Sequence, residues 1–222
     1  MSRAKVVQTH IPYGKPQELT NIITHAICAA LGFVGLVFLL IKSVGESATC
    51  TVSAAVFGGM LVAVFVVSVV RHSLRDGKAR DVFARFEHCA APALMLGAYA
   101  PVMLCGFGAG THTDAVWGYT LFAVLAALTA AIATLNGINA EKFKAVCLVG
   151  YVLGIIVCVM RVDLIFSLCG EEFFWMIFGG AAAYLAGMIF YSVKFSFGHV
   201  LWHVCAAAGA AIHFAAIYIY LL

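Results

Sequence analysis

Seven long apolar stretches, each separated from the next by a short polar segment, dominate this sequence. A helix of about 20 apolar residues is long enough to cross the hydrocarbon core of a bilayer. Because the bilayer interior offers the backbone no water, spanning segments of this kind fold as helices. The sequence therefore predicts an all-α protein, a seven-transmembrane helix bundle. The predicted helices cover residues 22–41, 52–70, 86–105, 116–135, 145–160, 173–191 and 198–222.

Composition favours a membrane protein and excludes other classes. Of the 222 residues, 64% are hydrophobic and 10% are charged, whereas a soluble domain is about 45–50% apolar and about 25% charged. These values exclude a soluble globular protein, a disordered chain and a coiled coil. The formal net charge of +3 is too small to indicate a nucleic-acid partner. We expect a multi-pass protein of the cell (plasma) membrane, with a cytoplasmic segment, 1–21, before a transmembrane domain, 22–222, and membrane lipids as partners.

The positive charges predict the orientation in the membrane. Of the 13 Lys and Arg residues, all but Lys42 and Arg161 lie in 1–21, in 71–85 and in the segments that contain Lys142, Lys144 and Lys194. Those segments share one side of a seven-helix bundle, and Lys and Arg accumulate on the cytoplasmic side. The N-terminus is therefore expected in the cytoplasm and the C-terminus outside the cell. G-protein-coupled receptors have the opposite orientation.

A group of polar residues in or at the ends of the predicted helices shares one depth. Such residues are costly in a bilayer and indicate a functional site by default. With the orientation given above, they all fall in the cytoplasmic third of the membrane. This group consists of His25, Ser68, His72, Glu87, His88, His199 and His203.

The spacing of these residues is suited to a zinc site. His199 and His203 are four residues apart and share one helix face, as do Ser68 and His72. A catalytic zinc ion typically has three protein ligands and an open fourth position. Two histidines from one helix and one from a facing helix supply three ligands. His213 lies ten residues beyond His203, about 15 Å along the helix, and is too distant to join them.

Structural explanations of the same residues remain open. An interfacial histidine can simply be a hydrogen-bonded structural residue, and Ser68 can mediate helix packing. Glu87 can pair with Arg85 or with a neighbouring arginine of the basic loop that residues 71–85 are expected to form. His88 is about 100° around the helix from Glu87 and is expected to face elsewhere.

The eight cysteines share no zinc-like spacing, and most lie in apolar runs. We interpret them as small buried apolar residues. Cys50 and Cys169 both fall near predicted outer ends, which leaves a bridge between them open.

Three segments resemble motifs of the haemolysin III family. Glu18-Leu-Thr-Asn21-Ile-Ile-Thr-His25 resembles its opening motif, and Phe86-Glu87-His88 through Gly97-Ala-Tyr99-Ala-Pro101 resembles its third-helix motif. Gly198-His199-Val-Leu-Trp202-His203 through Gly209 and His213-Phe214 resembles its last helix. The family is grouped with the progestin and adipoQ receptors, which include the adiponectin receptors, and is similar to the alkaline ceramidases.

The resemblance implies a zinc site and roles for its residues. The zinc-binding histidines of the adiponectin receptors match His72, His199 and His203, and a family serine matches Ser68. An aspartate that contacts the zinc-bound water matches Glu87, which is one methylene longer. The resemblance thus implies Zn²⁺ as cofactor, with Glu87 and Ser68 as catalytic residues in metal-assisted hydrolysis of a lipid amide or ester.

These features are compatible with three functions. The first is a zinc-dependent lipid hydrolase, and the second is a non-enzymatic sensor or regulator of the membrane that uses zinc as a structural tie. The third, a cytolysin or pore, has least support because the predicted helices between 116 and 191 carry almost no intramembrane charge. The first two share every feature of the sequence, so whether the protein is an enzyme stays open at this stage.

Overall fold

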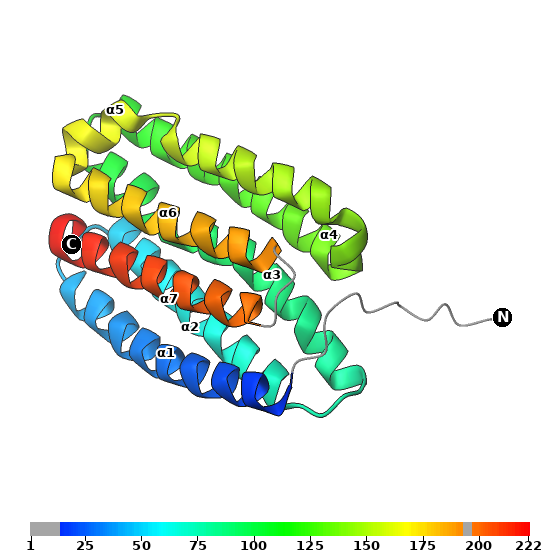
Figure 1. The fold of residues 1–222 in the computed structure, drawn as a ribbon. Helices are drawn as coiled ribbons and strands as arrows, with labels where there is room; N and C mark the ends of the chain where they lie inside the picture. Colours follow the sequence, from blue (N-terminus) through cyan, green and yellow to red (C-terminus); the bar gives the residue numbers. More distant parts are fainter. Residues whose placement is uncertain (1–13, 193–196) are drawn as a thin grey trace.

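The computed structural model describes residues 14–192 and 197–222 (Figure 1). All regular elements of these residues are helical, as the sequence predicted. The α-helices are α1 (Lys15–Lys42), α2 (Ala48–Ser73), α3 (Lys78–Pro101), α4 (His112–Val159), α5 (Val162–Leu164), α6 (Glu171–Ser192) and α7 (Gly198–Ala216). Short π- or 3₁₀-helical turns extend several of them: η1 (Val102–Gly106), η2 (Phe107–Ala109), η3 (Ile165–Cys169) and η4 (Ile217–Leu221).

Six helical stretches of the described chain are long and apolar enough to cross a membrane. They are Lys15–Lys42, Ala48–Ser73, Lys78–Ala109, His112–Val159, Glu171–Phe190 and Gly198–Leu221. Several begin earlier than the apolar runs suggest, because polar residues form their first turns. For example, α1 begins at Lys15, with Pro16 in its first turn, and α3 begins at Lys78.

The longest helix, α4, is broken at Asn139. At 1.5 Å per residue its 48 residues would extend about 72 Å, more than twice the thickness of a hydrocarbon core. Asn139 has extended backbone angles, and its side-chain oxygen accepts a hydrogen bond from the Lys142 amide at 2.9 Å, as a helix cap does. Figure 1 shows the chain reversing there, so that the arms 112–138 and 140–159 lie side by side.

Small residues let the helices approach one another closely. A Cβ atom added to Gly150 would lie 2.8 Å from the Ile132 side chain across the two arms of α4. At Gly118 the added atom would lie only 2.0 Å from the carbonyl oxygen of Met103 in η1. Around these contacts, Phe57, Leu125 and other buried side chains form the main apolar core.

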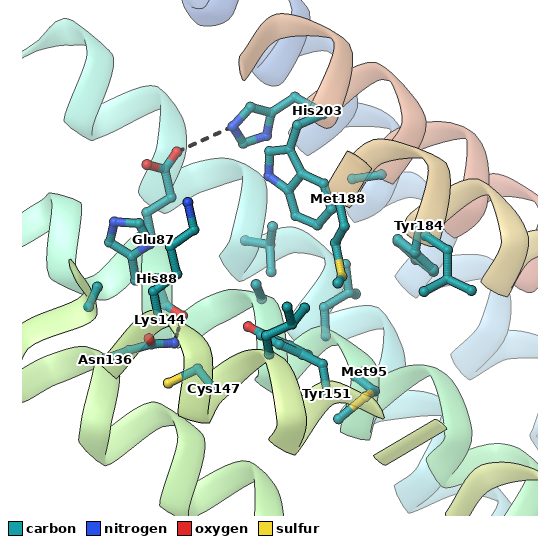
Figure 2. A pocket seen from close by; sticks show the side chains of 18 of the residues that line it. Glu87, His88, Met95, Asn136, Lys144, Cys147, Tyr151, Tyr184, Met188 and His203 are labelled. Carbon is teal, nitrogen blue, oxygen red and sulfur yellow. Dashed lines mark hydrogen bonds and ion pairs between the residues drawn. The ribbon is translucent and has the colours of Figure 1, made fainter. Parts of the chain in front are cut away.

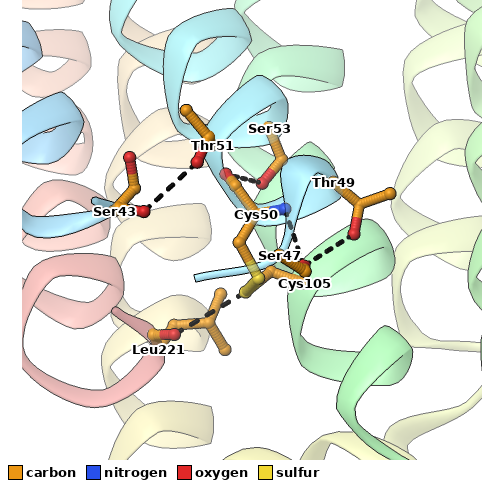
Figure 3. The surroundings of a disulfide bond; sticks show 8 residues. All are labelled: Ser43, Ser47, Thr49, Cys50, Thr51, Ser53, Cys105 and Leu221. Atoms are coloured by element: carbon orange, nitrogen blue, oxygen red, sulfur yellow. Dashed lines mark hydrogen bonds between the residues drawn. A yellow bond between two sulfur atoms is a disulfide. The ribbon is translucent and has the colours of Figure 1, made fainter. Parts of the chain in front are cut away.

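A disulfide joins Cys50, in the first turn of α2, to Cys105 in η1 (Figure 3). A bridge between Cys50 and Cys169 is therefore wrong, and Cys169 is a free buried thiol. Cys169 does lie close by, because a Cβ atom added to Gly106 would be 2.7 Å from its sulfur. All three cysteines lie at the same end of the bundle, so depth alone does not determine which two pair.

The close approach at Gly118 gives a prediction about stability. Gly118→Ala forces a methyl group against the Met103 carbonyl, and overpacking of this kind costs about 1–3 kcal/mol. Gly59→Ala is the matched control, because an added Cβ there meets no described atom within 4 Å. Thermal unfolding in detergent should show a lower melting temperature for Gly118→Ala alone. Equal melting temperatures for the two variants would contradict this packing.

Candidate metal centre

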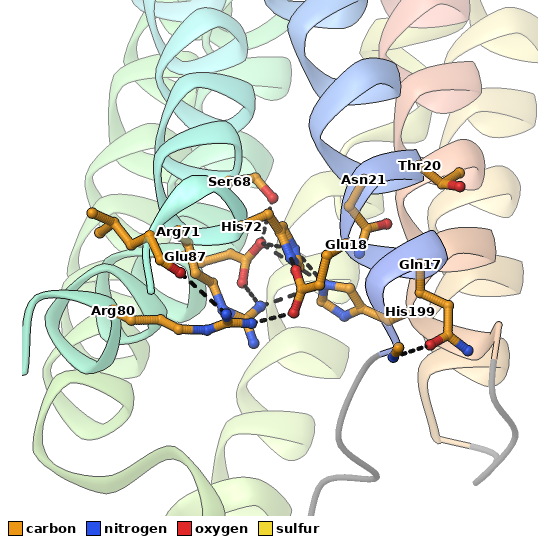
Figure 4. Close-up of polar contacts among 12 residues, drawn as sticks. Gln17, Glu18, Thr20, Asn21, Ser68, Arg71, His72, Arg80, Glu87 and His199 are labelled. Atoms are coloured by element: carbon orange, nitrogen blue, oxygen red, sulfur yellow. Dashed lines mark hydrogen bonds and ion pairs between the residues drawn. The ribbon is translucent and has the colours of Figure 1, made fainter. Parts of the chain in front are cut away.

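Three histidine side chains converge at the end of the bundle where α2 ends and α7 begins. Figure 4 shows His72 and His199, and Figure 2 shows His203. His72 comes from the last turn of α2, and His199 and His203 come from successive turns of α7. Nε2 of His199 lies 3.3 Å from Nε2 of His72 and 3.0 Å from Nε2 of His203. All three side chains are buried, so the structure brings together the three histidines that the sequence selected.

Glu87 of α3 completes the cluster. Its Oε1 lies 3.5 Å from Nε2 of His203, 3.8 Å from that of His72 and 3.9 Å from that of His199. Ser68, one turn before His72, donates a hydrogen bond of 2.5 Å to the same oxygen. One donor atom from each histidine and one from Glu87 all lie within 4.8 Å of one another.

The spacing of the donors fits a divalent metal ion. Two ligands that each lie 2.0–2.1 Å from a tetrahedral zinc ion are about 3.3 Å apart. The measured separations of 3.0 and 3.3 Å between imidazole nitrogens are close to this value. Imidazole and carboxylate are also donors that transition metals such as zinc accept. The buried cluster could therefore hold a metal ion, although the geometry does not identify the element.

Glu18 orients one of the histidines, a role that the sequence analysis did not assign. Its Oε2 lies 2.5 Å from Nδ1 of His72, and its other carboxylate oxygen accepts a hydrogen bond from Arg80 (Figure 4). Metal-binding histidines typically donate their second ring N–H to a carboxylate in this way. A sequence signal existed, because Glu18 lies in the first turn of α1, at the end of the bundle that holds the centre.

Arg71 is the arginine that pairs with Glu87, one of the structural alternatives that the sequence left open. Its expected location in a loop is wrong, because it lies in the last turn of α2, directly before His72. Its guanidinium group pairs with Oε2 of Glu87, and Nη1 lies 3.4 Å from Nε2 of His199. Glu87 thus pairs with this arginine through one oxygen and faces the histidines with the other.

The other histidines of the sequence analysis lie outside the four-donor cluster. His213 contacts the carbonyl oxygen of Ile177 through Nε2 at 2.9 Å, as expected of a residue too distant to join the centre. The backbone carbonyl of His88 accepts a hydrogen bond from Asn136. His25 of α1 lies against the cluster, with its ring centroid 3.9 Å from that of His203.

Comparison with known proteins identifies the family of the chain. The family model described as Haemolysin-III related matches residues 13–214. The chain belongs to the haemolysin III family. Hemolysin-3 of Bacillus cereus is 27% identical over 208 residues, which cover 93% of this chain and 92% of that protein. The Hemolysin-3 homolog of Bacillus subtilis (strain 168) is 30% identical over 207 residues, which cover 92% of this chain and 94% of that one.

Membership of the haemolysin III family and the six apolar helices together make the chain a multi-pass integral membrane protein. The family match also includes every donor of the cluster, from His72 to His203.

A cavity of about 230 Å³ leads to the centre of this haemolysin III protein (Figure 2). Glu87, His199 and His203 form one end of it, and Glu141 and Lys144 also line it. Its remaining walls are mostly apolar and come from α2, α3, both arms of α4, α6 and α7; among them are Leu94, Met95, Leu148, Ile155, Leu185 and Met188. The centre is therefore accessible from a space with a lipid-like lining.

The contact between Glu18 and His72 gives a second prediction. Glu18→Gln replaces a charged acceptor with a neutral amide and should weaken divalent-metal binding about 10–100-fold. The control is Asp76→Asn, because Asp76 also pairs with Arg80 but is exposed and does not contact a histidine. Competition with a chelator measures both affinities. Equal affinities in the two variants would show that Glu18 does not support the centre.

Proposed function

We propose that the protein is a zinc-dependent hydrolase of lipid amides or esters in the plasma membrane, with its centre near the cytoplasmic face. The observation that carries the proposal is the apolar cavity that ends on Glu87, His199 and His203. A closed structural site needs no such access, whereas a hydrolase must admit an acyl chain to its reacting groups. The buried set of three imidazoles and one carboxylate supports zinc as the ion.

We further propose seven membrane crossings. The arms 112–138 and 140–159 of α4 are each long enough to cross a hydrocarbon core of about 30 Å. An odd number of crossings places the two termini on opposite sides of the membrane.

Two features support an N-terminus in the cytoplasm. Five basic residues lie on or beside the α2–α3 connection, at the end that holds the centre, as the positive-inside rule requires: Arg71, Arg75, Lys78, Arg80 and Arg85. The disulfide lies at the opposite end, and disulfides persist in oxidising compartments outside the cytosol. Lys194 and residues 1–13, which entered the sequence argument, lie outside the described residues.

The side chains around the centre suit hydrolysis. When bound, zinc supplies Lewis acidity that polarises a carbonyl group and lowers the pKa of a water. Glu87 is the general base in this proposal, since its Oε1 faces the histidines. It accepts a proton from the attacking water, and the same carboxyl group later gives that proton to the leaving group. Ser68 holds Oε1 through its 2.5 Å hydrogen bond, while Arg71 holds Oε2. These two contacts fix the carboxylate on the edge of the cluster.

A second candidate function is a non-enzymatic sensor or regulator of membrane homeostasis with structural zinc. One observation favours it, because three histidines and Glu87 together offer four protein donors, the number found in closed structural sites. A cytolysin, which the names of the relatives suggest for those proteins, has less support. In the described part of α4 and α6, the charged side chains lie at helix ends or near the break at Asn139, so they do not form a continuous polar path.

Metal content tests the centre itself. We expect about one zinc per chain in purified wild-type protein by elemental mass spectrometry, and a large loss in His203→Ala. His213→Ala is the matched control, because it removes another buried histidine of α7 outside the donor cluster. Folded wild-type protein without zinc or another transition metal after metal-replete expression would refute the proposal.

Turnover separates the two candidate functions. Wild-type protein should hydrolyse some members of a panel of long-chain lipid amides and esters, and Glu87→Gln should lower kcat by about 10²–10⁴-fold while zinc stays bound. Ser53→Ala serves as a control, because Ser53 is a buried serine of α2 outside the centre that donates to its own helix. Zinc binding without turnover across the panel would favour the sensor.

A further inference from the structure

One face of α1 forms a polar region beside the metal centre. Glu18, Asn21 and His25 are three and four residues apart, so they lie on the same side of the helix. Glu18 contacts Nδ1 of His72. Asn21 and His25 are fully buried, but neither lines the cavity. Helix α1 thus reaches the centre from a different side than the cavity does.

His25 packs directly against a candidate metal ligand. Its ring centroid lies 3.9 Å from that of His203, with the two planes tilted by 55°, and 5.8 Å from that of His72. Phe65 borders it at 6.0 Å. The nitrogens of His25 are not among the four converging donors. The contact is therefore made with the ring of a ligand rather than with the place where an ion would lie.

Several buried polar atoms in this region have no hydrogen-bonding partner among the residues that the structure describes. They are both amide atoms of Asn21, both ring nitrogens of His25, and Nδ1 of His203. Buried polar groups in proteins are nearly always hydrogen-bonded, either to protein or to ordered water. A buried water molecule typically makes about three hydrogen bonds. The Asn21 amide has a donor and an acceptor and lies one helical turn from His25, whose ring packs against that of His203, so these side chains offer a suitable set of partners.

We propose that Asn21 and His25 hold ordered water against Nδ1 of His203 and so position this histidine. The inference rests on the proposed metal centre, because a metal-binding histidine donates its second ring N–H to a carboxylate, a carbonyl or a water. Glu18 is that partner for His72. Water held by Asn21 and His25 is the partner for His203. Asn21 and His25 are both positioning residues, since they act on the centre through His203.

The test measures the metal affinity of the full-length protein in detergent. Zn²⁺ binding is followed by competition with a chromophoric chelator, and the absorption spectrum of Co²⁺-loaded protein reports the ligand geometry. His25→Leu and Asn21→Leu should each weaken Zn²⁺ binding about 10–100-fold and change the Co²⁺ spectrum. The stoichiometry at saturation should remain one ion per chain.

Two further variants separate positioning from a general effect on the fold. His25→Gln keeps a donor and an acceptor and should restore most of the lost affinity. His213→Leu removes a buried histidine of α7 that contacts Ile177 instead of the centre, and should leave the affinity within about threefold of wild type.

The outcomes distinguish this inference from the proposed function. Wild-type protein that binds neither ion would overturn the metal centre, and the positioning role with it. If wild type binds but folded His25→Leu has the same affinity and Co²⁺ spectrum, only the positioning role is overturned. A His25→Gln variant as weak as His25→Leu also overturns it, because hydrogen-bonding capacity is then not what matters. If His25→Leu does not fold, Asn21→Leu against wild type decides the question in the same way.

Discussion

The enclosure of the Glu87 carboxylate, whose side chain is only 9% exposed, is the constraint on which this end of the bundle depends. A carboxylate inside a helix bundle is costly unless it is paired and hydrogen-bonded. Its partners come from two other helices, since Ser68 and Arg71 belong to α2 and His203 to α7. The carboxylate of α3 therefore ties α2 and α7 together at one depth. A shift of either helix would leave a buried charge with too few partners.

The charges around the centre also bear on its chemistry. Arg71 and Arg80 balance Glu87 and Glu18, with each arginine paired to one carboxylate. A divalent ion added to this balanced set leaves an excess of positive charge that its apolar surroundings screen poorly. In the proposed hydrolysis, such an excess would stabilise the negative charge that develops on a carbonyl oxygen.

The sequence was sufficient to predict that the residues of the cluster lie together, but not to predict which groups hold them in place. Depth along a membrane helix follows from its ends, and spacing fixes the face, so His72, Glu87 and the His199–His203 pair could be predicted to meet. Rotation of one helix against another does not follow from either property. For this reason Glu18 was not connected to His72. Arg71 was assigned to a loop because the predicted helix ended with the apolar run at residue 70, whereas α2 continues to Ser73. The expected disulfide partner of Cys50 was wrong because two other cysteines, Cys105 and Cys169, lie at the same end of the bundle.

The cavity divides the helices around the centre into two groups. It reaches Glu87, His199 and His203 but not His72, whose second nitrogen is held by Glu18 of α1. Helix α1 and the last turn of α2 thus support the donors, while α3 and α7 present them to the cavity. The second arm of α4 and helix α6 line the cavity and contribute no donor to the cluster. Movement of either would therefore change access to the centre while the donors stay in place. In the proposed hydrolase, the cavity walls would select the acyl chain and the polar groups of the centre would select the bond that reacts.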